Sequence, residues 1–199
     1  MWRWLKTNHQ ALTAVGAMVV GLAALYVAWD QARVMRDQQH GAVFPALQID
    51  GYSQNTTDQT QVGVRISNSG VGPAIIESVT LLRDGEPQQT LSPLISRMPE
   101  GYNQSWTSMR GRIMAPGAEV APIEFSWRPE RMSAEQTSEF IGEWFRWDVE
   151  ICYCSVFDRC WQTSTDQDER PRPAPRCQRD DEDIFQVLAN TPQLQDDAQ

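Results

Sequence analysis

An uncharged apolar run near the start of the chain constrains the architecture more than any other feature. Nineteen residues, 11–29, read ALTAVGAMVVGLAALYVAW and contain no Asp, Glu, Lys or Arg. A helix of about 20 such residues crosses the ~30 Å hydrocarbon core of a bilayer. The run therefore predicts a transmembrane helix, and it makes the lipid bilayer the first expected partner of this chain.

A removable signal peptide is the competing interpretation of this run. The apolar region of a signal peptide has about 7 to 15 residues and ends at a site with small side chains. This run is longer, and Tyr26 puts a bulky ring where the side chain should be small. Amphipathic rings suit the headgroup layers, and they flank both ends of the run at Trp2, Trp4, Tyr26 and Trp29. We therefore predict an uncleaved signal anchor.

The orientation in the membrane rests on a weak charge bias and on cysteine usage. Arg3 and Lys6 precede the run while Arg33 and Arg36 follow it, so the preference for a cytoplasmic amino terminus is slight. All 4 cysteines lie after the run, an even number that suits an oxidising compartment. We expect residues 1–10 in the cytoplasm and the main domain in the periplasm. The single lysine among 17 basic residues is typical of a GC-rich bacterial genome, hence a bacterial inner membrane.

After the run, the pattern changes from helical to strand-like. Residues 30–40 (DQARVMRDQQH) are good helix formers, so we expect a helical stalk over residues 30–43. From residue 44 the apolar residues alternate with polar ones, as in strands with one buried face. These alternating positions are Leu47, Ile49, Val62, Val64 and Ile66. Further strands are predicted over residues 74–83, closed by an Asp84-Gly85 turn, and over residues 120–127.

The middle of the domain is less regular. Residues 90–98 and 101–108 contain Pro93 and Gly101 and are expected to be crossover loops with at most a short helix. Ser133 followed by Gln136 is a capping-box pattern, which predicts a short helix to about Gly142. The regular alternation then returns.

Residues 145–154 carry the clearest strand pattern. Phe145, Trp147, Val149, Ile151 and Tyr153 alternate with polar residues and cysteines, so all five are expected in the core. Strands and turns at this spacing predict a mainly β fold, an antiparallel β-sandwich over residues 44–165.

Three segments resemble a known kind of domain. They are NSGVGPAIIESVTLLRDG (68–85), APGAEV (115–120) and a terminal hairpin with Tyr153 and Trp161. Together they resemble the immunoglobulin-like extramembrane domain of uncharacterised single-pass bacterial membrane proteins, over residues 44–164. The resemblance implies an Ig-like β-sandwich on a stalk and attaches no activity to it.

Four cysteines form the most unusual cluster of the chain. Cys154 and Cys160 face each other if they flank a five-residue hairpin loop, and Cys152, on the same face, then pairs with Cys177. That second bond closes a loop of about 25 residues, worth roughly 3 kcal/mol. Three connectivities are open. A zinc site of four thiolates and a redox centre are the alternatives, although neither a zinc-knuckle spacing nor a C-x-x-C motif is present.

Residues 166–199 are predicted to form an irregular tail rich in proline and acidic residues. Residues 170–176 (RPRPAPR) suggest an extended connector, and the acidic run 180–183 suggests a disordered, solubilising segment. An apolar cluster follows that could dock as a short helix on its own domain or on a partner. Its members are Ile184, Phe185, Val187 and Leu188.

Small side chains recur along the apolar run at alternating steps of three and four residues. In one stripe they would let another helix approach closely, which suggests a second copy or another membrane protein as a partner. The stripe consists of Ala14, Ala17, Gly21, Ala24 and Ala28.

The remaining residues favour a binding role over catalysis. Both histidines, His9 and His40, lie at or before the stalk, so a histidine-dependent triad in the domain is not expected. Asp148 and Glu150 share a strand face but are best explained as solvated charges. The net charge of −9 argues against a nucleic-acid partner. We expect a non-enzymatic binding or assembly subunit of the envelope, without cofactor or metal, and a cysteine-based metal or redox sensor as the alternative.

Overall fold

The computed structural model describes residues 9–165, 170–179 and 181–190. The sequence predictions for residues 1–8 and for Asp180 lie outside these ranges. The chain divides into two compact units, Met1–Ala42 and Val43–Gln199, which are described separately.

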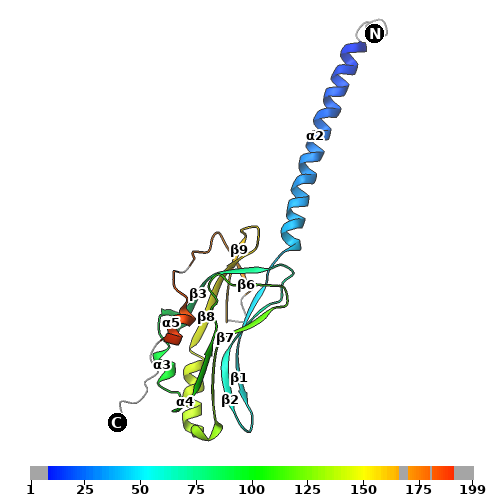
Figure 1. Ribbon diagram of the computed structural model, residues 1–199. Coiled ribbons are helices and arrows are strands. Elements are labelled where there is room, and N and C mark those ends of the chain that lie inside the picture. Colours follow the sequence, from blue (N-terminus) through cyan, green and yellow to red (C-terminus); the bar gives the residue numbers. More distant parts are fainter. Residues whose placement is uncertain (1–8, 166–169, 180, 191–199) are drawn as a thin grey trace. The chain divides into compact units, whose positions relative to one another are not determined.

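The described part of the first unit is one long helix, α2 (His9–Ala42) (Figure 1). Its segment Thr13–Gln39 is long and apolar enough to cross a membrane, with a mean hydropathy of 1.6, and a signal sequence would have the same properties. The described side chains of α2 are exposed. One turn apart on its surface, the Arg33 guanidinium lies 4.0 Å from the centroid of the Trp29 ring. The apolar run and the expected stalk are thus one continuous helix.

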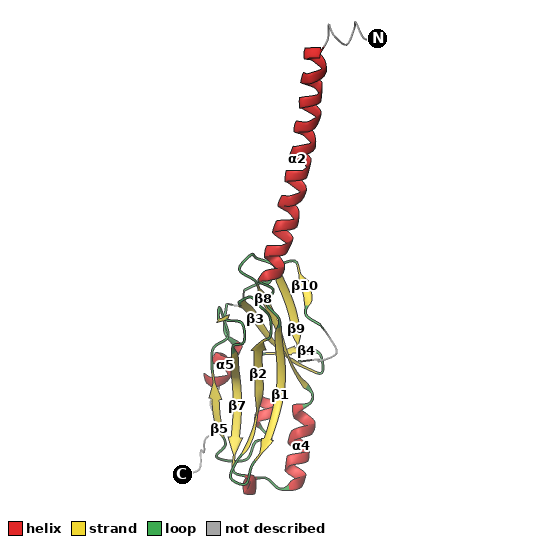
Figure 2. Cartoon of the chain, turned by 90° about the vertical axis from the view of Figure 1, so that its right-hand side faces the viewer, coloured by secondary structure: helices red, strands yellow, loops and turns green. Residues whose placement is uncertain are grey.

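The second unit is built from two antiparallel sheets (Figure 2). The first sheet has the order β1 (Leu47–Asn55), β2 (Thr60–Asn68), β7 (Glu119–Trp127) and β5 (Asn103–Trp106). The second has the order β10 (Arg172–Ala174), β9 (Cys160–Ser164), β8 (Trp147–Cys154), β3 (Ala74–Arg83) and β4 (Glu86–Gln88), and β6 (Ile113–Met114) also pairs with β3. The predicted mainly β architecture is confirmed.

Short helices connect and flank the strands. They are α3 (Ser92–Ile95), the 3-10 helix η1 (Pro129–Arg131), α4 (Ala134–Trp144) and α5 (Ile184–Asn190). The capping box that begins α4 is present: Ser133 Oγ accepts from Gln136 N, and Gln136 Oε1 accepts from Ser133 N. Each end of this interaction satisfies a backbone donor that the first turn of a helix leaves free.

A single hydrophobic core lies between the sheets. Its largest fully buried side chains include Phe125, Ile66, Ile76, Ile151 and Tyr153. The alternation seen in the sequence places these residues inward because successive strand side chains point to opposite faces. The backbone N–H of Leu47 donates to Tyr153 Oη at 3.4 Å, which connects a strand of the first sheet to a ring from the second.

Asn68 organises the turn at the start of the domain. Its side-chain Nδ2 donates to Gly72 O at 2.8 Å and to Met114 O at 3.0 Å, while its Oδ1 accepts from Ala46 N and Gly70 N. The residue is fully buried, and all of its polar capacity is used. A Cβ at Gly70 or Gly72 would overlap the backbone of residues 43–46. This explains why the turn is rich in glycine.

Two sequence predictions for the sandwich are wrong. Phe145 is 79% exposed, because it is the C-cap of α4 and β8 begins two residues later. Val149, Ile151 and Tyr153 are buried as expected, and Trp147 is half-buried. The second error concerns residues 101–108, which contain strand β5 paired with β7. Its sequence NQSW lacks an apolar alternation because most of this edge strand is exposed.

Candidate functional site around the cysteine cluster

The hairpin of β8 and β9 places two cysteines directly opposite each other. Cys154 pairs with Cys160 in the register of the sheet, and a disulfide joins them across a Cα–Cα distance of 4.0 Å. In the loop between them, Ser155 N donates to Arg159 O at 2.7 Å and Asp158 adopts a φ of 56°. Asp tolerates this left-handed conformation better than most residues, so the loop closes tightly.

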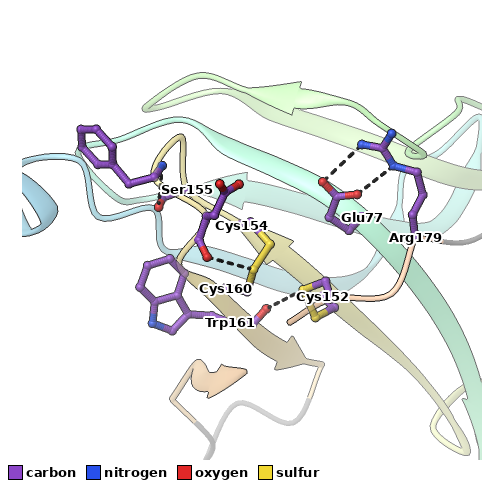
Figure 3. Close-up of a disulfide and its surroundings, with 10 residues drawn as sticks. Glu77, Cys152, Cys154, Ser155, Cys160, Trp161 and Arg179 are labelled. Carbon is purple, nitrogen blue, oxygen red and sulfur yellow. Dashed lines mark hydrogen bonds and ion pairs between the residues drawn. A yellow bond between two sulfur atoms is a disulfide. The ribbon is translucent and has the colours of Figure 1, made fainter. Parts of the chain in front are cut away.

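The second disulfide fastens the segment of residues 170–179 to the sheet (Figure 3). Cys152 in β8 bonds to Cys177, 25 residues further along the chain. Next to it, β10 pairs with β9, with Ala174 opposite Cys160. Arg179 Nε donates to Glu77 Oε2 at 2.8 Å and adds a charged contact with β3. Both disulfides are the pairings expected from the sequence.

The sulfur atoms of the two disulfides form one cluster. Those of Cys154, Cys160 and Cys177 all lie within 4.8 Å of one another. A sulfur in a disulfide carries no thiolate, which is the form that binds zinc. In the oxidised state shown in Figure 3, the cluster therefore has a structural role, and metal binding would require its reduction first.

An open groove of about 1050 Å³ lies over this cluster. Acidic side chains line it at Glu77 and Asp158, and basic ones at Arg176 and Arg179. The disulfides fix the backbone on both of its sides, Cys154 and Cys160 from the hairpin and Cys177 from the C-terminal segment. The groove is thus a polar, mixed-charge surface on a rigid frame.

Asp183 anchors the C-terminal end of the described chain. Its Oδ2 accepts from Ser108 Oγ, Met109 N and Arg110 N at 2.7–2.8 Å, and its Oδ1 accepts from Phe185 N at 2.9 Å. Burial raises the pKa of Asp183, but these hydrogen bonds lower it more, so the pKa lies below its ordinary value. The carboxylate caps α5 and joins it to the loop before β6.

The helix α5 is part of the core. Phe185 is fully buried and Leu188 is 1% exposed, while Ile184 is half-buried and Val187 lies at the surface. Neighbouring strands are β5 and β3. The apolar cluster at the C-terminal end thus docks on its own domain.

The tail differs from its sequence prediction in two places. Residues 172–174 form the edge strand β10, and Asp183 is a buried cap, so this part of the acidic run is ordered. Residues 166–199 are therefore not one irregular tail, because the described part contains a strand and a docked helix. Composition did not predict this, because an Asp that accepts five hydrogen bonds from described residues cannot be distinguished by sequence from a solvated Asp.

Sequence reasoning also missed a buried glutamate in α4. Glu143 is 3% exposed. Its Oε1 accepts hydrogen bonds from Arg83 Nε at 2.6 Å and from Trp147 Nε1 at 3.0 Å. The hydrogen bond from Arg83 lowers the pKa of Glu143, burial raises it, and the Trp147 bond lowers it again, leaving it below the usual range. Arg97 and Arg146 lie 3.4 Å from the other carboxylate oxygen. This cluster joins α4 to the second sheet and to α3.

The remaining predicted positions are described one by one. The small-residue stripe Ala14, Ala17, Gly21, Ala24 and Ala28 lies on α2, with every member exposed. Asp148 Oδ1 accepts from Thr165 Oγ1 at 3.0 Å, which gives it a local structural role. His9 and His40 belong to α2, outside the β-domain.

Comparison with protein-family models, with curated proteins and with solved structures finds no match to this chain. The function is therefore inferred from the fold and the surfaces alone.

Proposed function

We propose that this chain is a single-pass protein of the bacterial inner membrane whose Ig-like β-sandwich lies in the periplasm. It acts as a non-enzymatic binding or assembly subunit. The observation that carries the proposal is an exposed apolar helix covalently joined to a β-domain held by two disulfides. Such a chain tethers a folded β-domain to a membrane.

The exposure of α2 supports the anchor. Most of its apolar side chains are exposed: Val15, Met18, Val20, Leu22 and Leu25 are each at least 60% exposed. Contiguous apolar surface of this extent is rare in water and marks contact with lipid or protein. A lipid bilayer is the environment that removes this surface from water along the whole run.

The strand order supports the Ig-like assignment. The first sheet, β1-β2-β7-β5, follows the A-B-E-D order of an immunoglobulin domain, and β9-β8-β3 follows G-F-C. Strand β4 then occupies the position of strand C′, and β10 is an extra edge strand that the immunoglobulin order does not contain. The chain departs from antibody domains in its disulfides, which lie on the second sheet instead of joining B to F.

The disulfides support the periplasm, because such bonds persist in oxidising compartments. An alkaline phosphatase fusion at Gln199 tests this location, since the enzyme is active only where disulfides form. We expect an active fusion. An inactive but fully expressed fusion would put the domain in the cytoplasm.

The groove over the cysteine cluster is the proposed contact surface for a protein partner. It combines fixed backbone with charges of both signs, which favour a specific orientation of the bound partner. None of the described side chains of the β-domain is a histidine, so the commonest general base is missing from the groove. A binding role fits this inventory better than hydrolysis does.

Site-specific crosslinking in native membranes tests the proposal. A photoreactive residue at Gln178, exposed in the groove, should crosslink to another polypeptide or to a second copy of the chain. The same residue at Gln54, exposed on β1 and outside the groove, is the matched control. Failure of Gln178 to crosslink, or equal crosslinking from both positions, would contradict the groove as the contact surface.

The sulfur cluster supports a second candidate, a metal or redox sensor. Three sulfurs within 4.8 Å could be drawn together as thiolates once both disulfides are reduced. Thiol counts with and without reductant, followed by elemental analysis of the reduced protein, test this function. Bound metal at one equivalent per chain would favour the sensor, and metal-free reduced protein would remove it.

A further inference from the structure

A pocket of about 160 Å³ enters the sandwich between its two sheets. Apolar side chains from both sheets line it, with Val64 and Phe125 on one side and Leu81 and Val149 on the other. Protein interiors hold few voids larger than a water molecule. An apolar cavity of roughly 150 Å³ in another protein stays dry and binds benzene, so this pocket has the size of one six-membered ring.

Gly51 of β1 lines the pocket with its backbone alone. Leu47 and Ile49 face the core, and the period of two puts Gly51 on the same face of β1, at a position that is exposed. A Cβ at Gly51 would lie 3.5 Å from Trp144 Nε1, an ordinary van der Waals distance. The glycine is therefore not required by a close contact, and its effect is to leave this position open.

Aromatic rings lie where the pocket meets solvent. Trp144 and Trp147 are half-buried and Phe145 is 79% exposed, and all three line the pocket. Stacking on Phe140, at 6.3 Å between centroids, orients the Trp144 ring. Exposed rings beside an apolar opening provide faces on which another ring can pack.

The indole of Trp144 supplies one polar group of the pocket, which Asp148 and Thr165 also line. Trp147 Nε1 donates to Glu143, but no described residue accepts a hydrogen bond from Trp144 Nε1. This nitrogen is the atom nearest to the open position at Gly51. A ligand in the pocket can therefore complete a hydrogen bond that the described chain leaves unmade.

We propose that this pocket binds a monocyclic aromatic compound that carries one hydrogen-bond acceptor. The ring lies among the apolar side chains of the two sheets, and the acceptor receives the Trp144 Nε1 hydrogen. This site is distinct from the groove over the cysteine cluster, so it does not depend on the proposed function.

Methyl and indole NMR of the full-length protein in amphipol tests the proposal, with acetophenone as the probe. We expect saturable shifts of the Val64, Leu81 and Val149 methyl signals and a downfield shift of the Trp144 indole proton. The variant Gly51→Leu places a side chain in the pocket and should weaken binding at least tenfold. Gly51→Val repeats the test with a smaller side chain that suits a strand.

The matched control is Ser53→Leu, which adds the same side chain at an exposed position of β1 outside the pocket. It should bind acetophenone as the unchanged protein does. Because acetophenone partitions into the amphipol equally in all variants, this control also shows which shifts come from the amphipol and which from the pocket. Shifts that do not saturate, or that persist in Gly51→Leu and Gly51→Val, would overturn the site. N-acetylphenylalanine amide represents an aromatic side chain within a peptide. Its binding, without binding of acetophenone, would overturn the proposal that the ligand is a free aromatic compound.

Discussion

The two ends of this chain differ in the way their apolar residues are covered. Helix α2 has the most apolar sequence in the chain, and its described side chains are exposed. The C-terminal segment is polar and rich in proline and charge, but Phe185 and Leu188 are buried in the core. A disulfide, an ion pair and a capped helix hold this segment to the sandwich.

The difference teaches that mean hydropathy does not identify which segments join a core. A uniformly apolar helix has no polar face to leave in water, so it needs an apolar medium on all sides. A mostly polar segment needs only two or three correctly placed apolar residues and a way to fix its backbone. The following predictions test this contrast, from the largest expected effect to the smallest.

Truncating Phe185 should cost the most, because the ring is fully buried in the core. We expect Phe185→Ala to lower the free energy of unfolding by about 4 kcal/mol, as for other buried rings. Urea denaturation monitored by tryptophan fluorescence measures this loss. The neighbouring Gln186→Ala, at an exposed position, should change stability by less than about 0.5 kcal/mol. Equal, small effects of both variants would mean that α5 is not docked.

Removal of the Cys152–Cys177 disulfide should have the next largest effect. The bond closes a loop of 25 residues, so replacing both cysteines by serine should cost about 3 kcal/mol. Replacing Cys154 and Cys160, which are 6 residues apart, should cost only about 2 kcal/mol in the same treatment. Denaturation of the two double variants side by side gives the comparison. Peptide mapping without reductant gives an independent check, and a bond between Cys152 and Cys160 would contradict it.

Asp183 should make the docking of the C-terminal segment sensitive to acid. Its folded-state pKa lies below the ordinary value near 4. The carboxylate therefore stabilises the fold above about pH 4, and this contribution is lost as the pH falls through the folded-state pKa. The pKa of Glu143 is also lowered, so the pH dependence of its contribution to stability has the same direction. We expect Asp183→Asn to cost about 2 kcal/mol at neutral pH and to reduce the acid dependence of unfolding.

Hydrogen exchange of the α5 amides between pH 3 and pH 7 separates Asp183 from Glu143. In the unchanged protein, protection of α5 should fall more steeply at low pH than protection of β3. Asp181→Asn is the control, because Asp181 is exposed. Acid sensitivity of α5 that is identical in Asp183→Asn and in the unchanged protein would show that another group is responsible.

Gly21→Leu should leave the stability of the β-domain unchanged within about 0.5 kcal/mol. Nothing described lies within 4 Å of a Cβ at this position. If the small-residue stripe packs against another helix, the same variant should lower the oligomeric state of the protein in detergent, as measured by light scattering. Val19→Leu, at an exposed position outside the stripe, is the control. An unchanged oligomeric state and unchanged co-purifying proteins would remove the stripe as a contact.

Sequence patterns predicted most of the fold where a local rule applies. The strand over residues 74–83 was predicted with the bounds that β3 has, because Asp84-Gly85 permits the positive φ values that end it. The Ser133 capping box was predicted for the same kind of reason. Phe145 was misplaced because an alternating pattern continues across a helix C-cap without any change in composition.

The candidate site was predicted in part. Register alone put Cys154 opposite Cys160, since a tight hairpin fixes which residues face each other. The groove over the cluster was not predicted, because it depends on Arg179 of the C-terminal segment reaching Glu77 of β3, 102 residues earlier. The aromatic pocket was not predicted either, because a glycine in a strand has the same pattern whether it faces a cavity or solvent.

The sequence by itself determined the long apolar helix, the strands with period two and the positions of most turns. These features depend on interactions between residues that are near in the chain. Only the tertiary structure decided that Asp183 is a buried cap, that Glu143 accepts a hydrogen bond from Arg83 and that Gly51 lines a pocket. The physical reason is that the environment of a polar or missing side chain is set by residues distant in sequence, and the residue type does not encode them.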